Sequence, residues 1–314
     1  MSRFAERIAR EYPLRFKPKE KEAFRLYLMG TLRELGYAPK LQSRETALRI
    51  GGHVTNVVAG DPETAKLVFV AHYDTPLKSL LPPLIMPTRP MTAFLYLALT
   101  PVLVMLGSVV LSFALTFAVN APHWTLPLFL LLLLSALLYL RFGPAETRNT
   151  NDNSSGVAAL LETAAALTPR YRGEVAFAFL DGGFSGMSGA KALRKDCPAL
   201  RETPVINVNC VAEGDELLIL PNKNSRWDGE LLDAILESFE NGTHTTAFLK
   251  TDGLVYYPSD NRAFRHAVAI CACDKVKGFG RLIRPLRATE IDEEHLTLLK
   301  NGLSRLAARY QTEA

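Results

Sequence analysis

Apolar positions follow two different patterns over most of this chain. Short continuous apolar stretches alternate with segments in which apolar residues recur every three or four positions. The first pattern is typical of strands covered on both faces, and the second of amphipathic helices. The predicted strands lie within KLVFVAHYDTP (66–76), EVAFAFL (174–180), TPVINVNCV (203–211) and HAVAICAC (266–273), and the predicted helices within residues 20–36, 153–167 and 292–311. This alternation indicates an α/β fold with a mainly parallel sheet, helices on both sides and sites at the carboxyl ends of strands. Gly36 is expected to end the first helix and Asp292 to cap the last.

The segment from Met91 to Leu140 breaks this pattern, because it contains no Asp, Glu, Lys or Arg. It comprises two apolar runs, Met91–Val119 and Trp124–Leu140, joined by a short polar turn. A helix needs about 20 apolar residues to span a bilayer core, and aromatic residues such as Trp124 and Tyr139 are common at membrane interfaces. We therefore expect a transmembrane helical hairpin, although the shorter second run leaves a re-entrant geometry open. The alternative is an apolar hairpin buried in a soluble core.

Basic residues flank the hairpin and are missing from its connecting turn. Lys78 and Arg89 precede it, and Arg141 and Arg148 follow it. The positive-inside rule then places both chain ends in the cytoplasm. The expected protein is a multi-pass membrane protein with a cytoplasmic soluble domain. Its predicted parts are the first part of the α/β domain (1–90), the hairpin (91–140) and the second part of the domain (141–314).

Composition excludes several classes of protein. A net charge of +4 does not indicate a nucleic-acid-binding protein. Four cysteines are too few and too scattered for a disulfide framework, and Cys271 and Cys273 fit a buried strand better than a zinc pair. The N-terminal segment MSRFAERIAREYPLRF lacks the apolar core and cleavage site of a secretory signal.

Polar residues occur where two of these elements end or begin. His72 and Asp74 follow the first predicted strand, two positions apart and therefore on the same side of an extended chain. Such a pair suits a metal ligand that is supported by a carboxylate. The segment NDNSSG (151–156) precedes a predicted helix, where an ordinary turn and N-cap would also account for it.

The segment LDGGFSGMSG (180–189) is a third candidate, a turn from strand to helix. It lacks both the Lys-Ser/Thr pair of a Walker loop and the spacing G-x-G-x-x-G, so a phosphate-binding loop is not indicated. Neither Ser185 nor Ser188 is followed two positions later by Gly, which excludes a nucleophile elbow. A serine enzyme of another kind would need a paired base, which the sequence does not indicate.

Taken together, these segments resemble metallopeptidase family 28, which contains co-catalytic zinc aminopeptidases, glutamate carboxypeptidases and the transferrin receptor. The resemblance rests, in chain order, on VFVAHYDT, NDNSSGVAALLETA, VAFAFLDGGFSGMSGAKAL, VINVN, YYPSDNRAFRHAVAI and ATEIDEEHLTLL. It covers nearly all of the chain outside the hairpin. It implies a zinc-aminopeptidase-like three-layer sandwich with a mainly parallel mixed sheet, into which the two-helix hairpin is inserted.

The resemblance preserves part of the family's metal site. His72 matches a zinc ligand, Asp74 matches its acidic supporter, and Asp152 matches the carboxylate that bridges two zinc ions. Asp260 and His266 fall in the segment that resembles the wall of the substrate pocket. Together with Asn209, they are the candidate pocket residues.

The other positions of that metal site are lost. The general-base Glu of the family falls on Gly183, and the zinc-ligand Glu beside it falls on Phe184. The ligand Asp falls on Asn209, and the last ligand His, counted back from the terminal helix, falls on Leu282. A catalytic zinc ion needs about three protein ligands and an open position, so the remaining ligands are expected to be insufficient.

These losses predict a membrane-anchored aminopeptidase-like protein that has lost zinc-peptidase activity, holds no cofactor and serves as a binding or scaffold protein. The alternative is an active membrane-bound zinc metallo-aminopeptidase with a rebuilt site.

The pocket is expected near the inner membrane face, and LKSLLPPLIMPTRP (77–90) is expected to form a collar between domain and bilayer. The expected partners are membrane lipids and a membrane protein or peptide. A group of basic residues could contact anionic headgroups; the alternative is an ordinary solvated basic loop. These residues are Lys275, Lys277, Arg281, Arg284 and Arg287.

Overall fold

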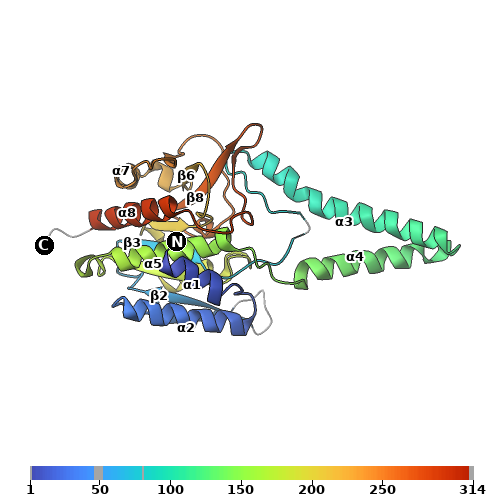
Figure 1. Ribbon diagram of the computed structural model, residues 1–314, viewed down its shortest axis with the longest axis horizontal. Coiled ribbons are helices and arrows are strands. Elements are labelled where there is room, and N and C mark those ends of the chain that lie inside the picture. Colours follow the sequence, from blue (N-terminus) through green and yellow to red (C-terminus); the bar gives the residue numbers. More distant parts are fainter. Residues whose placement is uncertain (1, 46–51, 80, 311–314) are drawn as a thin grey trace.

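The computed structural model describes residues 2–45, 52–79 and 81–310. These residues form a sheet between two layers of helices, and a long helical hairpin projects from this α/β domain (Figure 1). The strands are β1 (Lys40–Glu45), β2 (His53–Ala59), β3 (Leu67–His72), β4 (Val175–Leu180), β5 (Val205–Val208), β6 (Glu216–Pro221), β7 (Thr246–Leu249), β8 (Ala267–Val276) and β9 (Gly280–Leu282). The helices are α1 (Arg3–Glu11), α2 (Pro18–Glu34), α3 (Pro90–Ala118), α4 (Thr125–Phe142), α5 (Ser155–Ala166), α6 (Ser188–Asp196), α7 (Gly229–Ser238) and α8 (Glu293–Arg309).

The sheet has the strand order β1-β2-β4-β3-β5-β8-β6-β7, and β9 pairs with the far end of β8. The central strands β4, β3, β5 and β8 are parallel to one another. Antiparallel pairs flank them, β2 with β4 on one side and β6 with β8 on the other. The predicted α/β fold with a mainly parallel mixed sheet is confirmed, and all four predicted strands belong to this central group.

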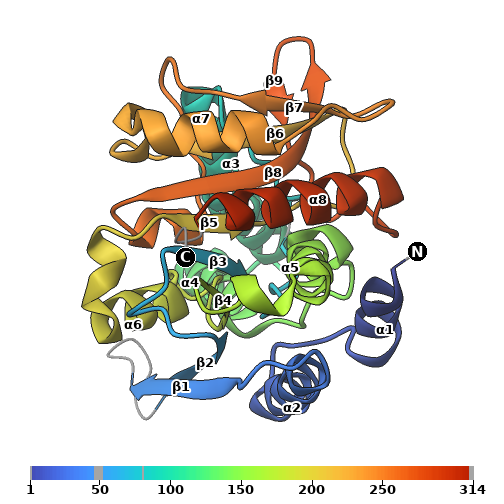
Figure 2. The same ribbon diagram turned by 90° about the vertical axis from the view of Figure 1, so that its left-hand side faces the viewer.

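The central strands are buried on both faces, because alternate side chains pack into different layers. Phe69 and Phe177 pack in the larger core, which α1, α2, α5 and α8 cover. Val68, Val70 and Ala178 point the other way, into a core that contains residues of α6. Figure 2 shows α5 and α8 on one side of the sheet and α6 on the other. This two-sided burial explains why these strands appear in the sequence as continuous apolar runs.

The predicted helix ends agree with the structure. Helix α2 ends at Glu34, and Gly36 follows with a φ of 85°, a left-handed conformation in which Gly has no steric cost. Asp292 caps α8, since its carboxylate accepts hydrogen bonds from the backbone N–H groups of Glu294 and His295.

Helices α3 and α4 form an antiparallel hairpin outside the core. Both contain spans long and apolar enough to cross a membrane, Pro90–Ala118 with mean hydropathy 2.3 and Pro122–Leu140 with mean hydropathy 1.9. Of the most apolar 18 residues of each span, 6% are buried in the first and 0% in the second. The alternative of a hairpin buried in a soluble core is therefore wrong, because the surface it would bury faces outward (Figure 1).

Small polar residues form the contact between the two helices. Ser108, Ser112 and Thr116 recur every four positions on α3 and are buried. Thr116 Oγ1 lies 2.8 Å from Thr125 Oγ1 at the start of α4, so this stripe faces the second helix. The hydroxyl groups of Ser108 and Ser112 donate to carbonyl groups of their own helix. Small residues of this kind let two apolar helices approach closely.

The segments that join the hairpin to the domain are tied to each other and to the sheet. Leu77 and Ala145 form an antiparallel bridge between the entering and leaving segments. Ile85 exchanges two backbone hydrogen bonds with Ile283, at 3.1 and 2.9 Å. Residues 77–90, which we call the collar, therefore lie between the domain and the hairpin, and the hairpin leaves the domain at the edge of the sheet where β3 ends.

Candidate functional site

Polar residues gather at the carboxyl ends of β3, β4 and β5, which are neighbours in the sheet. His72 is the last residue of β3, Gly183 follows β4, and Asn209 directly follows β5. Asp152 lies in the turn before α5. Parallel strands bring these segments to the same edge, so the structure unites residues that are far apart in the sequence.

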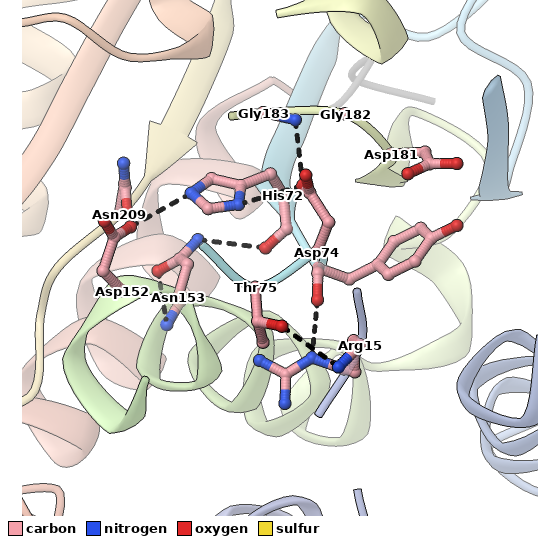
Figure 3. Close-up of polar contacts among 12 residues, drawn as sticks. Arg15, His72, Asp74, Thr75, Asp152, Asn153, Asp181, Gly182, Gly183 and Asn209 are labelled. Atoms are coloured by element: carbon pink, nitrogen blue, oxygen red, sulfur yellow. Dashed lines mark hydrogen bonds and ion pairs between the residues drawn. The ribbon is translucent and has the colours of Figure 1, made fainter. Parts of the chain in front are cut away.

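The His72 ring lies between two carboxylates (Figure 3). Its Nε2 is 3.2 Å from Asp152 Oδ1, and its Nδ1 is 3.4 Å from Asp74 Oδ1. Burial by itself lowers the pKa of His72, but the hydrogen bonds and charges of Asp152 and Asp74 outweigh it and raise the pKa well above its ordinary value. The two carboxylates therefore favour the protonated, positively charged form of His72.

Asp74 is held as an anion by several partners. Burial raises the pKa of Asp74, but His72, Lys21 and the Gly183 N–H more than offset this and lower the pKa to about 2. The Gly183 N–H donates to Asp74 Oδ1 at 2.8 Å. Lys21 of α2 forms a buried ion pair with Asp181 at the end of β4. This contact could not be predicted from the sequence, because Lys21 and Asp181 are 160 positions apart.

The space around His72 is filled at the two positions, 183 and 184, where the resemblance to family 28 implied carboxylates. A Cβ atom at Gly183 would lie between 2.6 and 2.9 Å from atoms of the His72 side chain, closer than side-chain atoms pack. The Phe184 ring contacts His72 edge-on, with 5.0 Å between ring centroids and an interplanar angle of 90°. Neither position offers a metal ligand.

Arg15 and Asn153 fix the segments that carry the site. The buried Arg15 guanidinium donates to the Tyr73 carbonyl at 2.5 Å and to Ser154 Oγ at 2.9 Å. Asn153 Nδ2 donates to the carbonyl groups of His72 and Val208, and thus links β3 with β5 (Figure 3). Sequence reasoning found the NDNSSG segment but not this connecting role.

Two candidate pocket residues lie beside the cluster with unused acceptor atoms. Asn209 Nδ2 donates to Ser259 Oγ at 2.8 Å, and Asn209 Oδ1 has no hydrogen-bond partner among the described residues. Neither carboxylate oxygen of the buried Asp260 has such a partner in the described ranges. The pKa of Asp260 is raised to about 6, mainly by burial. The charge of His72 lowers this pKa, and the charges of Asp74 and Asp152 raise it.

Two other predicted residues are not brought to this cluster. His266 lies directly before β8, at the opposite edge of the sheet, where its Nε2 is 3.8 Å from Glu202. Leu282 is buried on β9 and pairs with Asp274 of β8, which holds it away from the cluster. Leu286, four residues later, lines the cavity described next, as do Asp152 and Phe184.

A cavity of about 650 Å³, here called the site cavity, opens beside the cluster. Polar residues of its wall include Lys21, Asp74, Asp152 and Ser185. Leu140, near the end of α4, also lines it, so the hairpin contributes to its wall. The volume is in the range of about 300–1,000 Å³ that is common for small-molecule sites.

Metal donors are few in this cluster. Across residues 2–45, 52–79 and 81–310, no three His, Cys, Asp or Glu side chains are arranged to hold a metal ion. His72, Asp74 and Asp152 are instead paired with one another.

Comparisons with known proteins agree with this architecture. The sequence model of peptidase family M28 matches residues 141–279. No curated protein matches the sequence. Among solved structures, the glutaminyl cyclase of Porphyromonas gingivalis is 15% identical with a TM-score of 0.57, covering 98% of this chain and 96% of that one.

Two further solved structures are similar. A Zn-dependent exopeptidase from Parabacteroides distasonis is 14% identical with a TM-score of 0.58, covering 98% of this chain and 96% of its own. A leucine aminopeptidase precursor from Bacteroides thetaiotaomicron is 13% identical with a TM-score of 0.57, covering 99% and 95% of the respective chains. At such identities the similarity establishes the fold and not the reaction. The α/β domain of this chain has the fold of peptidase family M28.

Proposed function

We propose that this chain is a membrane-anchored, aminopeptidase-like protein without zinc-peptidase activity that binds a ligand in its site cavity. The packing of His72 against Gly183 carries the proposal. In this arrangement His72 lies 3.2 Å from Asp152 and 3.4 Å from Asp74, and in its protonated form it would neutralise both carboxylates without a metal ion. The general-base position is occupied by the ring itself, so a glutamate at position 183 would have to displace His72.

The loss of the metal site would not leave an inert surface. The site cavity persists, and Asn209 and Asp260 lie near Asp152 of its wall, with acceptor atoms that have no hydrogen-bond partner among the described residues. A buried carboxylate without a partner reduces stability, and groups of this kind are commonly retained at functional sites. This favours a ligand-binding role, with Asp260 and Asn209 as the candidate recognition residues.

Membrane anchoring follows from the hairpin. The two spans are joined by a short turn, so both ends of the α/β domain emerge on the same side. Lys78, Arg89 and Arg148 lie on that side, and no Lys or Arg lies in the turn. The positive-inside rule then places the domain in the cytoplasm, with the collar and the mouth of the site cavity close to the bilayer.

Metal analysis is the most direct test of the proposal. The purified full chain is expected to contain far less than one zinc ion per molecule by mass spectrometry of the metal, and to show no EDTA-sensitive cleavage of aminoacyl amides. The matched variant Asp152→Asn should give the same traces of metal as the parent. About one or two zinc ions per chain, lost in that variant and accompanied by cleavage, would establish the active alternative.

A second prediction concerns the space at Gly183. Gly183→Ala is expected to lower the free energy of unfolding by about 1–3 kcal/mol, because the new methyl group overlaps the His72 ring. Gly173→Ala is the matched control, since a Cβ there meets nothing within 4 Å. Thermal unfolding in detergent compares the two. An unchanged stability of Gly183→Ala would show that His72 is free to leave its place between the carboxylates.

A third prediction is a pH dependence due to Asp260. Its folded pKa of about 6 exceeds the ordinary 3.8, so the folded state binds the proton more tightly, and stability falls as the pH rises between these values. At pH 7.5, Asp260→Asn should therefore unfold at a higher temperature than the parent. Its free energy of unfolding should be greater by up to about 3 kcal/mol. The difference should shrink near pH 4. A difference that is the same at both pH values would contradict this account.

A fourth prediction concerns topology. Translated in the presence of microsomes, the full chain is expected to resist carbonate extraction, while added protease digests the α/β domain and leaves a protected fragment that contains residues 91–140. Replacing residues 91–140 by a Gly-Ser linker should release the protein from the membrane fraction. Carbonate extraction of the full chain, or protection of the whole domain, would refute this topology.

A further inference from the structure

A second cavity lies at the base of the hairpin, and the chemistry described so far does not use it. Its volume is about 550 Å³. We call it the collar cavity, because residues of the collar form one wall and the first three turns of α3 form another. Its described lining contains no Asp, Glu, Lys, Arg or His side chain; Ile85, Met86, Phe94, Leu97 and Tyr256 are among the residues that line it.

The walls of this cavity are fixed by hydrogen bonds. The Tyr96 hydroxyl group on α3 donates to the Pro82 carbonyl of the collar at 2.7 Å. Ile85 is joined to Ile283 by two backbone hydrogen bonds, and the Tyr256 N–H donates to the Pro87 carbonyl at 3.0 Å. A pocket whose opposite walls are connected in this way is formed before any ligand enters.

The collar cavity adjoins the site cavity. Ser79 and Pro83 line both, so a single stretch of collar separates an uncharged, apolar space from one whose mixed wall contains charged side chains. The hairpin contributes to each, α3 to the collar cavity and Leu140 of α4 to the site cavity. A ligand that extends from one cavity to the other must therefore be apolar at one end and polar at the other.

We propose that the two cavities form one site for a bilayer lipid, whose acyl chain lies in the collar cavity and whose headgroup reaches the site cavity. This inference rests on the proposed membrane anchoring and ligand binding. The first turns of α3 lead directly from the proposed membrane span into the collar cavity, so an acyl chain enters without crossing water. Burial of its methylene groups against this apolar lining favours binding.

The charges of the site cavity select the headgroup. The charged side chains that line this cavity are Lys21, Asp74 and Asp152, and Lys21 is already paired with Asp181. Two carboxylates thus face the cavity beside one cation that has its own partner, which disfavours a net anionic headgroup and favours a zwitterionic one with an ammonium group. The basic loop beyond β8 does not reverse this preference, because Lys275, Arg281, Arg284 and Arg287 all form ion pairs with acidic side chains of the domain.

The test uses the full chain in vesicles of phosphatidylethanolamine and phosphatidylglycerol in equal amounts. After transfer to mild detergent, native mass spectrometry is expected to show one retained phosphatidylethanolamine per chain. Ala93→Trp and Thr100→Trp place an indole in the collar cavity and should lower the retained fraction at least about tenfold. The matched control Ala114→Trp, on the exposed surface of the same helix, should retain the lipid as the parent does.

A crosslinking experiment locates the lipid in the same vesicles. Phosphatidylethanolamine with a photoactivatable group at the end of one acyl chain is expected to label residues 81–100 of the parent and of Ala114→Trp, and not of the cavity-filling variants. Even labelling along both helices, equal retention in all variants, or preferential retention of phosphatidylglycerol would overturn the proposal. If the chain inserts into vesicles but shows any of these three outcomes, the proposed lipid site is wrong and the membrane anchor stands. A chain that does not enter vesicles refutes both proposals.

Discussion

The buried charge balance around His72 is the constraint on which the rest of the site depends. Two carboxylates at the end of a parallel sheet are costly to bury unless a cation compensates them. In this chain the His72 ring lies between Asp74 and Asp152, and their carboxylates favour its positively charged form. The Gly183 N–H and Lys21 complete the arrangement around Asp74. Each contact also joins two segments of the fold, so the balance of charge holds together β3, the turn after β4 and the turn before α5.

The hairpin is attached at the same place, and this links it to the site. The collar begins a few residues after His72, and the chain returns from α4 a few residues before Asp152. The bridge between Leu77 and Ala145 closes this excursion. The walls of both cavities are consequently built from residues that enter or leave the hairpin, so a change in the tilt of α3 or α4 would be transmitted to the cavity walls through fixed contacts.

The sequence predicted those features that depend on local pattern. Strands β3, β4, β5 and β8 were recognisable because two-sided burial makes them continuously apolar, and the hairpin because it lacks charge. The edge strand β1, with the sequence KLQSRE, is largely exposed, and β9 has only three residues, so neither leaves such a signal. The meeting of His72 with Asp152 was expected from the resemblance to the family. The roles of Lys21 and Arg15 were not expected, because they arise only from the docking of the N-terminal segments.

Loss of a catalytic residue and closure of the space it used are different events. A site that has only lost a glutamate keeps room for one, whereas the absence of a Cβ at Gly183 is what allows His72 to sit where it does. Phe184 then packs against the same ring. Because these residues are in contact, their effects are coupled and cannot be reversed one at a time. The domain thus combines the fold of peptidase family M28 with a packed His72–Gly183–Phe184 contact, beside a cavity whose wall includes Leu140 of the hairpin.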